Sequence, residues 1–175
     1  MSFFKIAGVC FILLFLFVGC HNKKIREESE RIEDRIVDFA CNIVRLHDTV
    51  MMKEYMRDDK FKILAIMNGD CDCILGSLMD FNVLIKNEKF KCFKNCVVVE
   101  GKNLYAFDKF MLHRNMYGNM AFFRDVEGEF CVKNKIEYSD FTLCLLDGNN
   151  SVLFCGDPIY NLKEEKEFKS LIEGL

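Results

Sequence analysis

Two short apolar runs, each followed by a stretch with helical spacing, constrain the fold more than any other feature of the sequence. Residues 61–67 (FKILAIM) and 91–100 (KCFKNCVVVE) are bounded by charged residues, Asn and Gly, which predicts two buried strands. Residues 74–86 and 104–113 follow these runs, with apolar positions at helical intervals. The order strand, helix, strand, helix predicts parallel strands joined by right-handed crossovers.

The last third of the chain adds further strands and a closing helix. Residues 141–146 and 151–155 are apolar and flank the turn sequence at 147–150 (DGNN), which predicts a β-hairpin. Residues 120–123 predict a short strand, and residues 162–172 predict a charged amphipathic helix. The fold class expected is therefore α/β, with a mixed sheet flanked by helices.

The first 20 residues have the composition of an export signal. Lys5 precedes an unbroken apolar run at residues 6–18, and polar residues begin directly after Gly19-Cys20. These are the parts of a secretory signal. An apolar run of this length rises only about 20 Å as a helix, less than the roughly 30 Å hydrocarbon core of a bilayer. We therefore predict that residues 1–19 are a removable signal peptide. A permanent membrane anchor is the alternative to a removable signal, and an ordinary cleaved signal is the alternative to the lipoprotein signal described next.

The Gly19-Cys20 pair resembles the lipobox of bacterial lipoproteins, with Phe17 in place of the usual Leu. That resemblance implies cleavage before Cys20 and attachment of a diacylglycerol to its thiol. The expected partner is then a membrane, and the expected location is the cell envelope, with the domain facing the periplasm or the exterior. The formal net charge of −3 offers no basic excess to displace phosphate counterions, which argues against a nucleic-acid partner.

A charged segment separates the proposed anchor from the α/β domain. Between residues 23 and 46, apolar side chains recur at intervals of four and three, which predicts an amphipathic helix. A coiled-coil seam is an alternative for this stretch, and a short strand is an alternative for residues 42–46. Residues 49–57 predict a second short helix. The domain organisation predicted is a signal peptide at 1–19, a lipid-anchored N-terminal helical segment at 20–58, and the α/β domain at 59–175.

The chain contains 10 cysteines, of which Cys10 and Cys20 belong to the signal region. In an oxidising envelope the others would be expected to pair. Cys131, Cys144 and Cys155 nevertheless lie in apolar, strand-like runs, where a free cysteine behaves as a small hydrophobe. The cysteine spacing is not that of a zinc site, so we predict that most of these residues belong to the core.

Cys71 and Cys73 are the strongest functional candidates, because they lie where the first buried strand ends and a helix begins. The N-terminus of a helix has a partial positive charge and free N–H groups, which stabilise a thiolate. Thiol–disulfide exchange needs one thiolate to attack a substrate disulfide and a second to resolve the mixed disulfide. We predict Cys71 as the nucleophile, because it is expected to be the more exposed, and Cys73 as the resolving cysteine.

Three segments resemble the thioredoxin-like superfamily, in particular the envelope-anchored TlpA and peroxiredoxin-related redoxins. They are FKILAIMNGDCDCILGSLMDF, VVVEGKNLYAFDKF and FTLCLLDGNNSVLFCGDP, and the similarity in element order covers roughly residues 60 to 175. The last segment is similar to the hairpin of redoxins, and the helix after Cys73 is similar to the one that follows their second active-site cysteine. The resemblance implies a thioredoxin-like fold, exchange with envelope thiols or disulfides, and no cofactor.

The sequence departs from that family in two places. The family motif is Cys-x-x-Cys, whereas only Asp72 separates Cys71 from Cys73, and its charge opposes thiolate formation. The family also has a cis-proline before the strand that begins here at Phe141, where this sequence has Asp140. Three functions therefore stay open: thiol–disulfide exchange through Cys71 and Cys73, a catalytically degenerate redoxin used for binding or scaffolding, and a soft-metal site for copper or zinc.

Overall fold

The computed structural model describes residues 35–40, 43, 50–102, 107, 120–137 and 139–175. The chain divides into two compact units, Met1–Arg35 and Ile36–Leu175. The predicted signal peptide, lipidation at Cys20 and most of the helix at 23–46 lie outside the described residues and stay predictions. Among the residues described, no helix has both the length and the apolar composition needed to cross a membrane.

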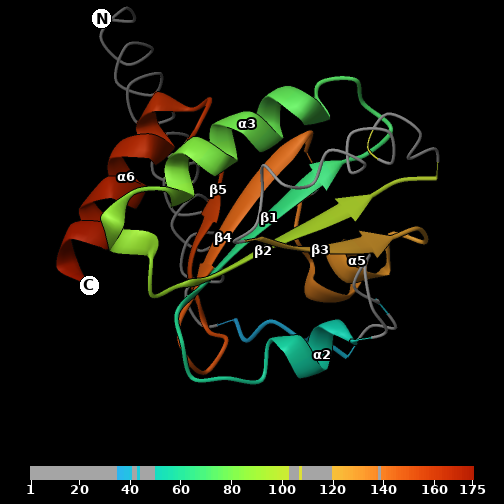
Figure 1. Cartoon of the computed structure of the whole chain (residues 1–175), viewed down its shortest axis with the longest axis horizontal. Helices are drawn as coiled ribbons and strands as arrows, with labels where there is room; N and C mark the ends of the chain where they lie inside the picture. The colour runs from blue at the N-terminus through green and yellow to red at the C-terminus, as the bar shows by residue number, and fades with distance from the viewer. Residues whose placement is uncertain (1–34, 41–42, 44–49, 103–106, 108–119, 138) are drawn as a thin grey trace, which may run out of the picture. The chain divides into compact units, whose positions relative to one another are not determined.

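A five-stranded mixed sheet forms the centre of the second unit, in the order β3-β2-β1-β4-β5 (Figure 1). Its strands are β1 (Lys62–Asn68), β2 (Lys94–Glu100), β3 (Met120–Asp125), β4 (Phe141–Leu146) and β5 (Val152–Gly156). Strand β2 pairs in parallel with both β1 and β3. Strand β4 pairs antiparallel with both β1 and β5. The predicted buried strands, the short strand and the hairpin are confirmed.

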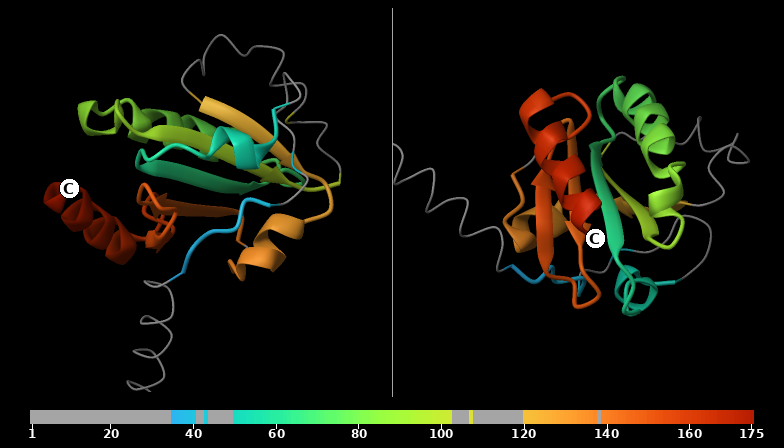
Figure 2. Two further views of the ribbon diagram at one scale, coloured as in Figure 1. Left: turned by 90° about the horizontal axis from the view of Figure 1, so that it is seen from below. Right: turned by 90° about the vertical axis from the view of Figure 1, so that its left-hand side faces the viewer.

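Helices cover both faces of this sheet. Ile63, Ala65 and Met67 of β1 point into one core together with α3 (Ile74–Ile85) and α6 (Leu162–Gly174). The helices α2 (Met52–Tyr55) and α5 (Glu129–Asn134) lie on the opposite face. Tyr55 of α2 contacts Phe123 of β3, and Phe130 of α5 contacts Phe39. Figures 1 and 2 show α3 and α5 on opposite sides of the sheet. The helices predicted for 49–57, 74–86 and 162–172 are thereby confirmed, and a short 3₁₀ helix, η1 (Glu88–Phe90), precedes β2.

Two expectations about local structure are wrong. Residues 35–40 are not helical. Ile36 forms a β-bridge with Ser151, and the Val37 N–H donates to the carbonyl of Asn150. Their burial alternates with the period of a strand, so that Ile36 is 70% exposed while Val37 is buried. Cys131 lies in the unpredicted helix α5 and not in a strand, although it is buried as expected. Of the predicted helix at 104–113, the structure describes only Phe107, which is helical and buried.

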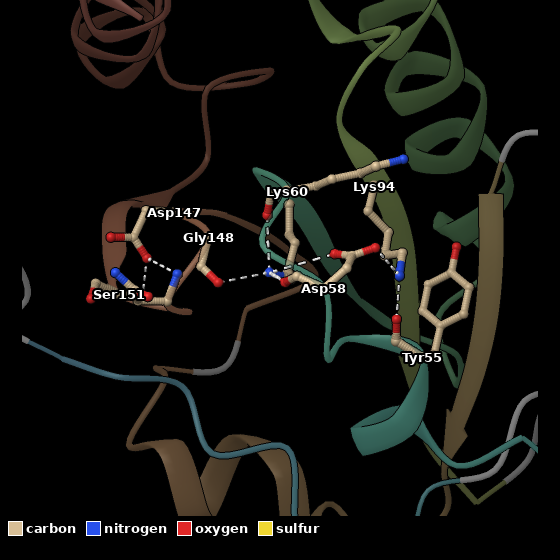
Figure 3. Close-up of polar contacts among 9 residues, drawn as sticks. Tyr55, Asp58, Lys60, Lys94, Asp147, Gly148 and Ser151 are labelled. Atoms are coloured by element: carbon tan, nitrogen blue, oxygen red, sulfur yellow. Dashed lines mark hydrogen bonds and ion pairs between the residues drawn. The ribbon is translucent and has the colours of Figure 1, made fainter.

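A buried ammonium group anchors the beginning of β1 (Figure 3). The Lys62 side chain has no solvent exposure, and its Nζ donates to the carbonyls of Asp58 at 2.7 Å, Lys60 at 2.9 Å and Gly148 at 3.4 Å. The Asp58 carboxylate lies 3.8 Å from this Nζ and 2.5 Å from that of Lys94. Lys94 begins β2, donates to the carbonyl of Tyr55, and places its Nζ over the Tyr55 ring. One carboxylate therefore joins the starts of β1 and β2.

Burial and the neighbouring charges shift the pKa values of Lys62 and Asp58. Burial lowers the pKa of Lys62, and the attraction of Asp58 offsets only part of that effect. Burial alone would raise the pKa of Asp58, but the hydrogen bond and the charge of Lys94 outweigh it, so the pKa is below its ordinary value. A carboxyl group with a depressed pKa stabilises the fold above the unfolded-state pKa of about 3.9. That stability is lost as the pH falls through the lower, folded-state pKa.

We predict that Asp58→Asn lowers the free energy of unfolding at pH 7 by about 1–2 kcal/mol, a value discounted for the partial exposure of the carboxylate. The loss should shrink once the pH falls below the depressed pKa of Asp58, where the carboxyl group of the original chain is itself protonated. Urea unfolding followed by circular dichroism at both pH values measures this difference. Asp59→Asn, at an exposed neighbouring position, is the matched control. An equal loss at both pH values would contradict the assigned role of the charge.

Candidate functional site

Cys71 and Cys73 lie in the turn between the carboxyl end of β1 and the start of α3. A disulfide joins them, with their Cα atoms 5.2 Å apart. The Ile74 N–H donates to the carbonyl of Cys71, and the Ser77 N–H donates to that of Cys73, so the helix begins within the motif itself. The structure therefore brings the two predicted site residues together at the predicted place.

The two sulfurs have different surroundings. Cys73 is exposed, whereas Cys71 is only partly exposed, which reverses the order expected from the sequence. The backbone N–H of Cys73 donates to Cys71 Sγ at 3.2 Å. The reason for the reversal is that Cys71 still belongs to the turn packed against the sheet edge, whereas Cys73 is the N-cap residue of α3. Cys73 is thus the more exposed residue of the pair, and Cys71 Sγ accepts a hydrogen bond from the backbone.

The turn before Cys71 is fixed to the neighbouring strand. The Gly69 N–H donates to the carbonyl of Glu100, the last residue of β2, at 2.7 Å. The Asp70 carboxylate accepts a hydrogen bond from the Lys102 N–H at 3.2 Å, and Lys102 directly follows Gly101 in the chain. Gly101 has a φ of +147°, and a Cβ there would lie 2.8 Å from Asp70 Oδ1. A glycine is needed at this position for both reasons.

Asp140 lies beside the disulfide, because β4 runs antiparallel to β1 and therefore begins where β1 ends. The Asn68 N–H donates to the Asp140 carbonyl at 3.2 Å, and Asn68 Nδ2 donates to Asp140 Oδ1 at 3.3 Å. A carboxylate oxygen of Asp140 and the sulfurs of Cys71 and Cys73 all lie within 4.8 Å of one another. This loop has no cis peptide bond among its described residues. Ser139 closes it with hydrogen bonds to the Phe141 carbonyl and Thr142 Oγ1.

An open groove extends from Cys73 between α3, the start of β4 and the segment after β5. It is lined by Asp72, Cys73, Gly76, Ser77, Ser139, Asp140, Phe141, Asp157 and Tyr160. Tyr160 packs edge-on against Phe141 and donates from its hydroxyl to Asp80 at 2.7 Å. Burial raises the pKa of Tyr160; the hydrogen bond with Ser77 lowers it, and the one with Asp80 raises it further. Tyr160 is therefore neutral at physiological pH.

The groove has an acidic character. Its lining includes three aspartates and no lysine, arginine or histidine. A thiolate that forms at either cysteine is repelled by the nearest carboxylates, and a positively charged substrate segment is attracted by them. The backbone donor at Cys71 Sγ and the N-terminus of α3 act in the opposite direction.

Sequence reasoning found the thiol pair but not the groups around it. The absence of a proline before Phe141 pointed to the loop of Asp140, but no role could be assigned because the partner of that loop is distant in sequence. No motif or spacing in the sequence indicated that Asn68 or Tyr160 belongs to the site. Cys92 is exposed and Cys96 is buried, and neither belongs to the site. Cys20 lies outside the described residues, so its lipidation stays a prediction.

The fold is similar to solved structures of thiol–disulfide proteins. A Chlorobium tepidum protein named as a thiol:disulfide interchange protein DsbE matches with a TM-score of 0.55 and 15% identity, over 79% of this chain and 99% of that chain. DsbF of Mycobacterium tuberculosis matches with a TM-score of 0.56 and 11% identity, over 75% and 91%. The C-terminal domain of a thiol-disulfide oxidoreductase from Bacteroides thetaiotaomicron matches with a TM-score of 0.53 and 12% identity, over 82% and 99%.

These likenesses show that the domain has the thioredoxin-like fold, as the order of its elements predicts. The sequence itself matches no family model and no curated protein.

We predict that Asp140→Asn makes the reduced thiol pair react about two- to threefold faster with iodoacetamide at pH 7, because a nearby negative charge is removed. Alkylation of the reduced protein, followed by mass spectrometry, measures the rate. Glu173→Gln removes an exposed carboxylate from the end of α6 and is the control. An unchanged or slower rate in Asp140→Asn would show that this carboxylate does not oppose thiolate formation.

Proposed function

We propose that this protein is an envelope thiol–disulfide oxidoreductase that reduces substrate disulfides through Cys71 and Cys73. The observation that carries the proposal is a disulfide at the start of α3 in which Cys73 is exposed and lines an open groove. The names of the structural neighbours, which include a thiol:disulfide interchange protein and a thiol-disulfide oxidoreductase, support the same chemistry. The predicted lipid anchor at Cys20 would hold the domain at a membrane surface.

The greater exposure of Cys73 and its place in the groove lining support a different step for each cysteine. The thiolate of Cys73 attacks one sulfur of a substrate disulfide, and the other substrate sulfur leaves as a thiolate. The thiolate of Cys71, stabilised by the N–H of Cys73, then attacks Cys73 Sγ and releases the first substrate sulfur. Two electrons pass to the substrate, and the protein ends as the disulfide described above. These roles are the reverse of those predicted from the sequence.

The groove indicates which substrates fit. Its carboxylates Asp72, Asp140 and Asp157 favour a disulfide that is flanked by lysine or arginine. Phe141 and Tyr160 offer an aromatic wall against which an apolar side chain of the substrate can pack. A protein disulfide in an extended, basic segment is the substrate class that this surface favours.

We predict that insulin reduction, with dithiothreitol as electron donor, is lost in both Cys71→Ser and Cys73→Ser and is retained in Cys92→Ser. Cys92 is an exposed cysteine outside the site and is therefore the matched control. Equal, background-level activity in all of these proteins, the original chain included, would rule out the oxidoreductase and favour a binding or scaffold role.

Trapping of the mixed disulfide separates the roles of the two cysteines. Cys71→Ser retains the attacking sulfur and lacks the resolving one, so it should accumulate at least tenfold more mixed disulfide than Cys73→Ser. Non-reducing electrophoresis with a disulfide-containing peptide measures the adduct. Accumulation in Cys73→Ser instead would restore the roles predicted from the sequence.

A soft-metal site is the second candidate, because Asp140 and both sulfurs are close enough to share one ion. Such a site requires the reduced pair, since bonded sulfurs are not thiolate ligands. Metal analysis of the reduced protein after incubation with zinc or Cu(I) tests it. One bound equivalent that is lost in Asp140→Asn and Cys73→Ser would favour this candidate.

A further inference from the structure

A second group of cysteines occupies the face of the sheet opposite α3. Ile63 and Ala65 point toward α3, so the intervening Leu64 points to the other face. Leu64 pairs in register with Cys96 on β2 and with Cys144 on β4, which places both cysteines on that other face. Cys144 in turn pairs with Cys155 on β5.

Cys144 and Cys155 are close enough to react with each other. They are direct partners in the antiparallel register of β4 and β5, and their Sγ atoms are 2.9 Å apart. Direct antiparallel partners have Cα and Cβ separations within or near the range that a disulfide spans. From this separation the sulfurs need to approach by less than about 1 Å to reach the bonding distance of about 2.05 Å.

The two thiols differ in access. Cys144 is fully buried, and Cys155 is partly exposed on the edge strand β5. The hydrogen bond with Cys155 and burial raise the pKa of Cys144 well above its ordinary value. A reagent from solvent therefore meets Cys155 first, and Cys144 is placed to complete the reaction.

We propose that Cys144 and Cys155 are a second oxidisable thiol pair, which closes to a disulfide across the β4–β5 hairpin by exchange with small-molecule disulfides. The thiolate of Cys155 attacks one sulfur of the small disulfide and releases the other as a thiolate. The thiolate of Cys144 then attacks Cys155 Sγ and releases the second small thiol. Two protein thiols are oxidised, one small disulfide is reduced to two thiols, and no other oxidant is needed.

This modification has a structural consequence that does not depend on the proposed enzymatic function. β5 is an edge strand and is paired only with β4 within the named strands. A covalent link between direct partners fixes the register of the hairpin and restricts the unfolded chain. The closed pair would thus stabilise the edge of the sheet in an oxidising compartment and open in a reducing one.

Peptide mapping of the full chain tests the proposal. The reduced protein is incubated with glutathione disulfide, denatured, blocked with N-ethylmaleimide and cleaved on the amino side of aspartate. Asp140, Asp147 and Asp157 place Cys144 and Cys155 on separate peptides, 140–146 and 147–156. We expect these peptides to be joined to each other and to separate only after reduction. Blocked thiols on both peptides, in a sample whose Cys71–Cys73 pair has reoxidised, would overturn the proposal.

Variants distinguish this pair from its neighbour Cys131, whose pKa is affected by Cys155. Cys131→Ala should retain the link between 140–146 and 147–156, and Cys155→Ala should abolish it. A link from Cys155 to Cys131 instead would also overturn the proposal.

Thermal unfolding provides a second readout, in a Cys71→Ser/Cys73→Ser background so that only the hairpin pair changes. Closure should raise the midpoint of unfolding by roughly 5–10 °C. Cys144→Ala/Cys155→Ala in the same background should show no shift on oxidation. The absence of any shift in the protein that carries both hairpin cysteines would contradict the proposed stabilisation.

Discussion

The pairing of β1 with a parallel strand on one side and an antiparallel strand on the other is the constraint on which the rest of the structure depends. Parallel strands end at the same edge of a sheet, and an antiparallel neighbour begins there. The turn after β1, the turn after β2 and the loop before β4 therefore meet at one edge. Cys71, Gly101 and Asp140 are separated widely in sequence, yet this pairing brings them to a single site.

Polar contacts at the other end of β1 hold that strand pairing in place. The buried ammonium of Lys62 collects carbonyls from both sides of β1, including that of Gly148 in the β4–β5 turn. Asp58 extends the cluster to Lys94 at the start of β2. The polar cluster and the thiol pair thus lie at opposite ends of the same strand. An unpaired charge in this cluster would destabilise the fold that positions the sulfurs at the other end.

Hydrophobic periodicity was sufficient to predict the sheet, because strands buried on both faces leave a continuous apolar run. It failed where tertiary contact decides the conformation. Residues 35–40 have helical spacing in the sequence, but Ile36 forms a β-bridge with Ser151 and Phe39 packs on Phe130, both of them distant in sequence. The prediction that Cys71 is the more exposed cysteine failed for a similar reason. Which sulfur faces solvent depends on where the first turn of α3 begins, and a one-residue spacer leaves both choices equally compatible with the sequence.

The charges around the thiol pair favour the direction of electron transfer proposed for it. A disulfide is uncharged, whereas reduction produces a thiolate that must lie near Asp72 and Asp140. Redox proteins that act as strong oxidants stabilise their reduced form, which requires positive charge or donors near the thiolate. Here a single N–H reaches Cys71, and the groove lining supplies negative charge only. These carboxylates disfavour the thiolate, whereas the N–H of Cys73 and the N-terminus of α3 favour it. The reduction of a substrate disulfide, as proposed above, is the direction that the carboxylates support.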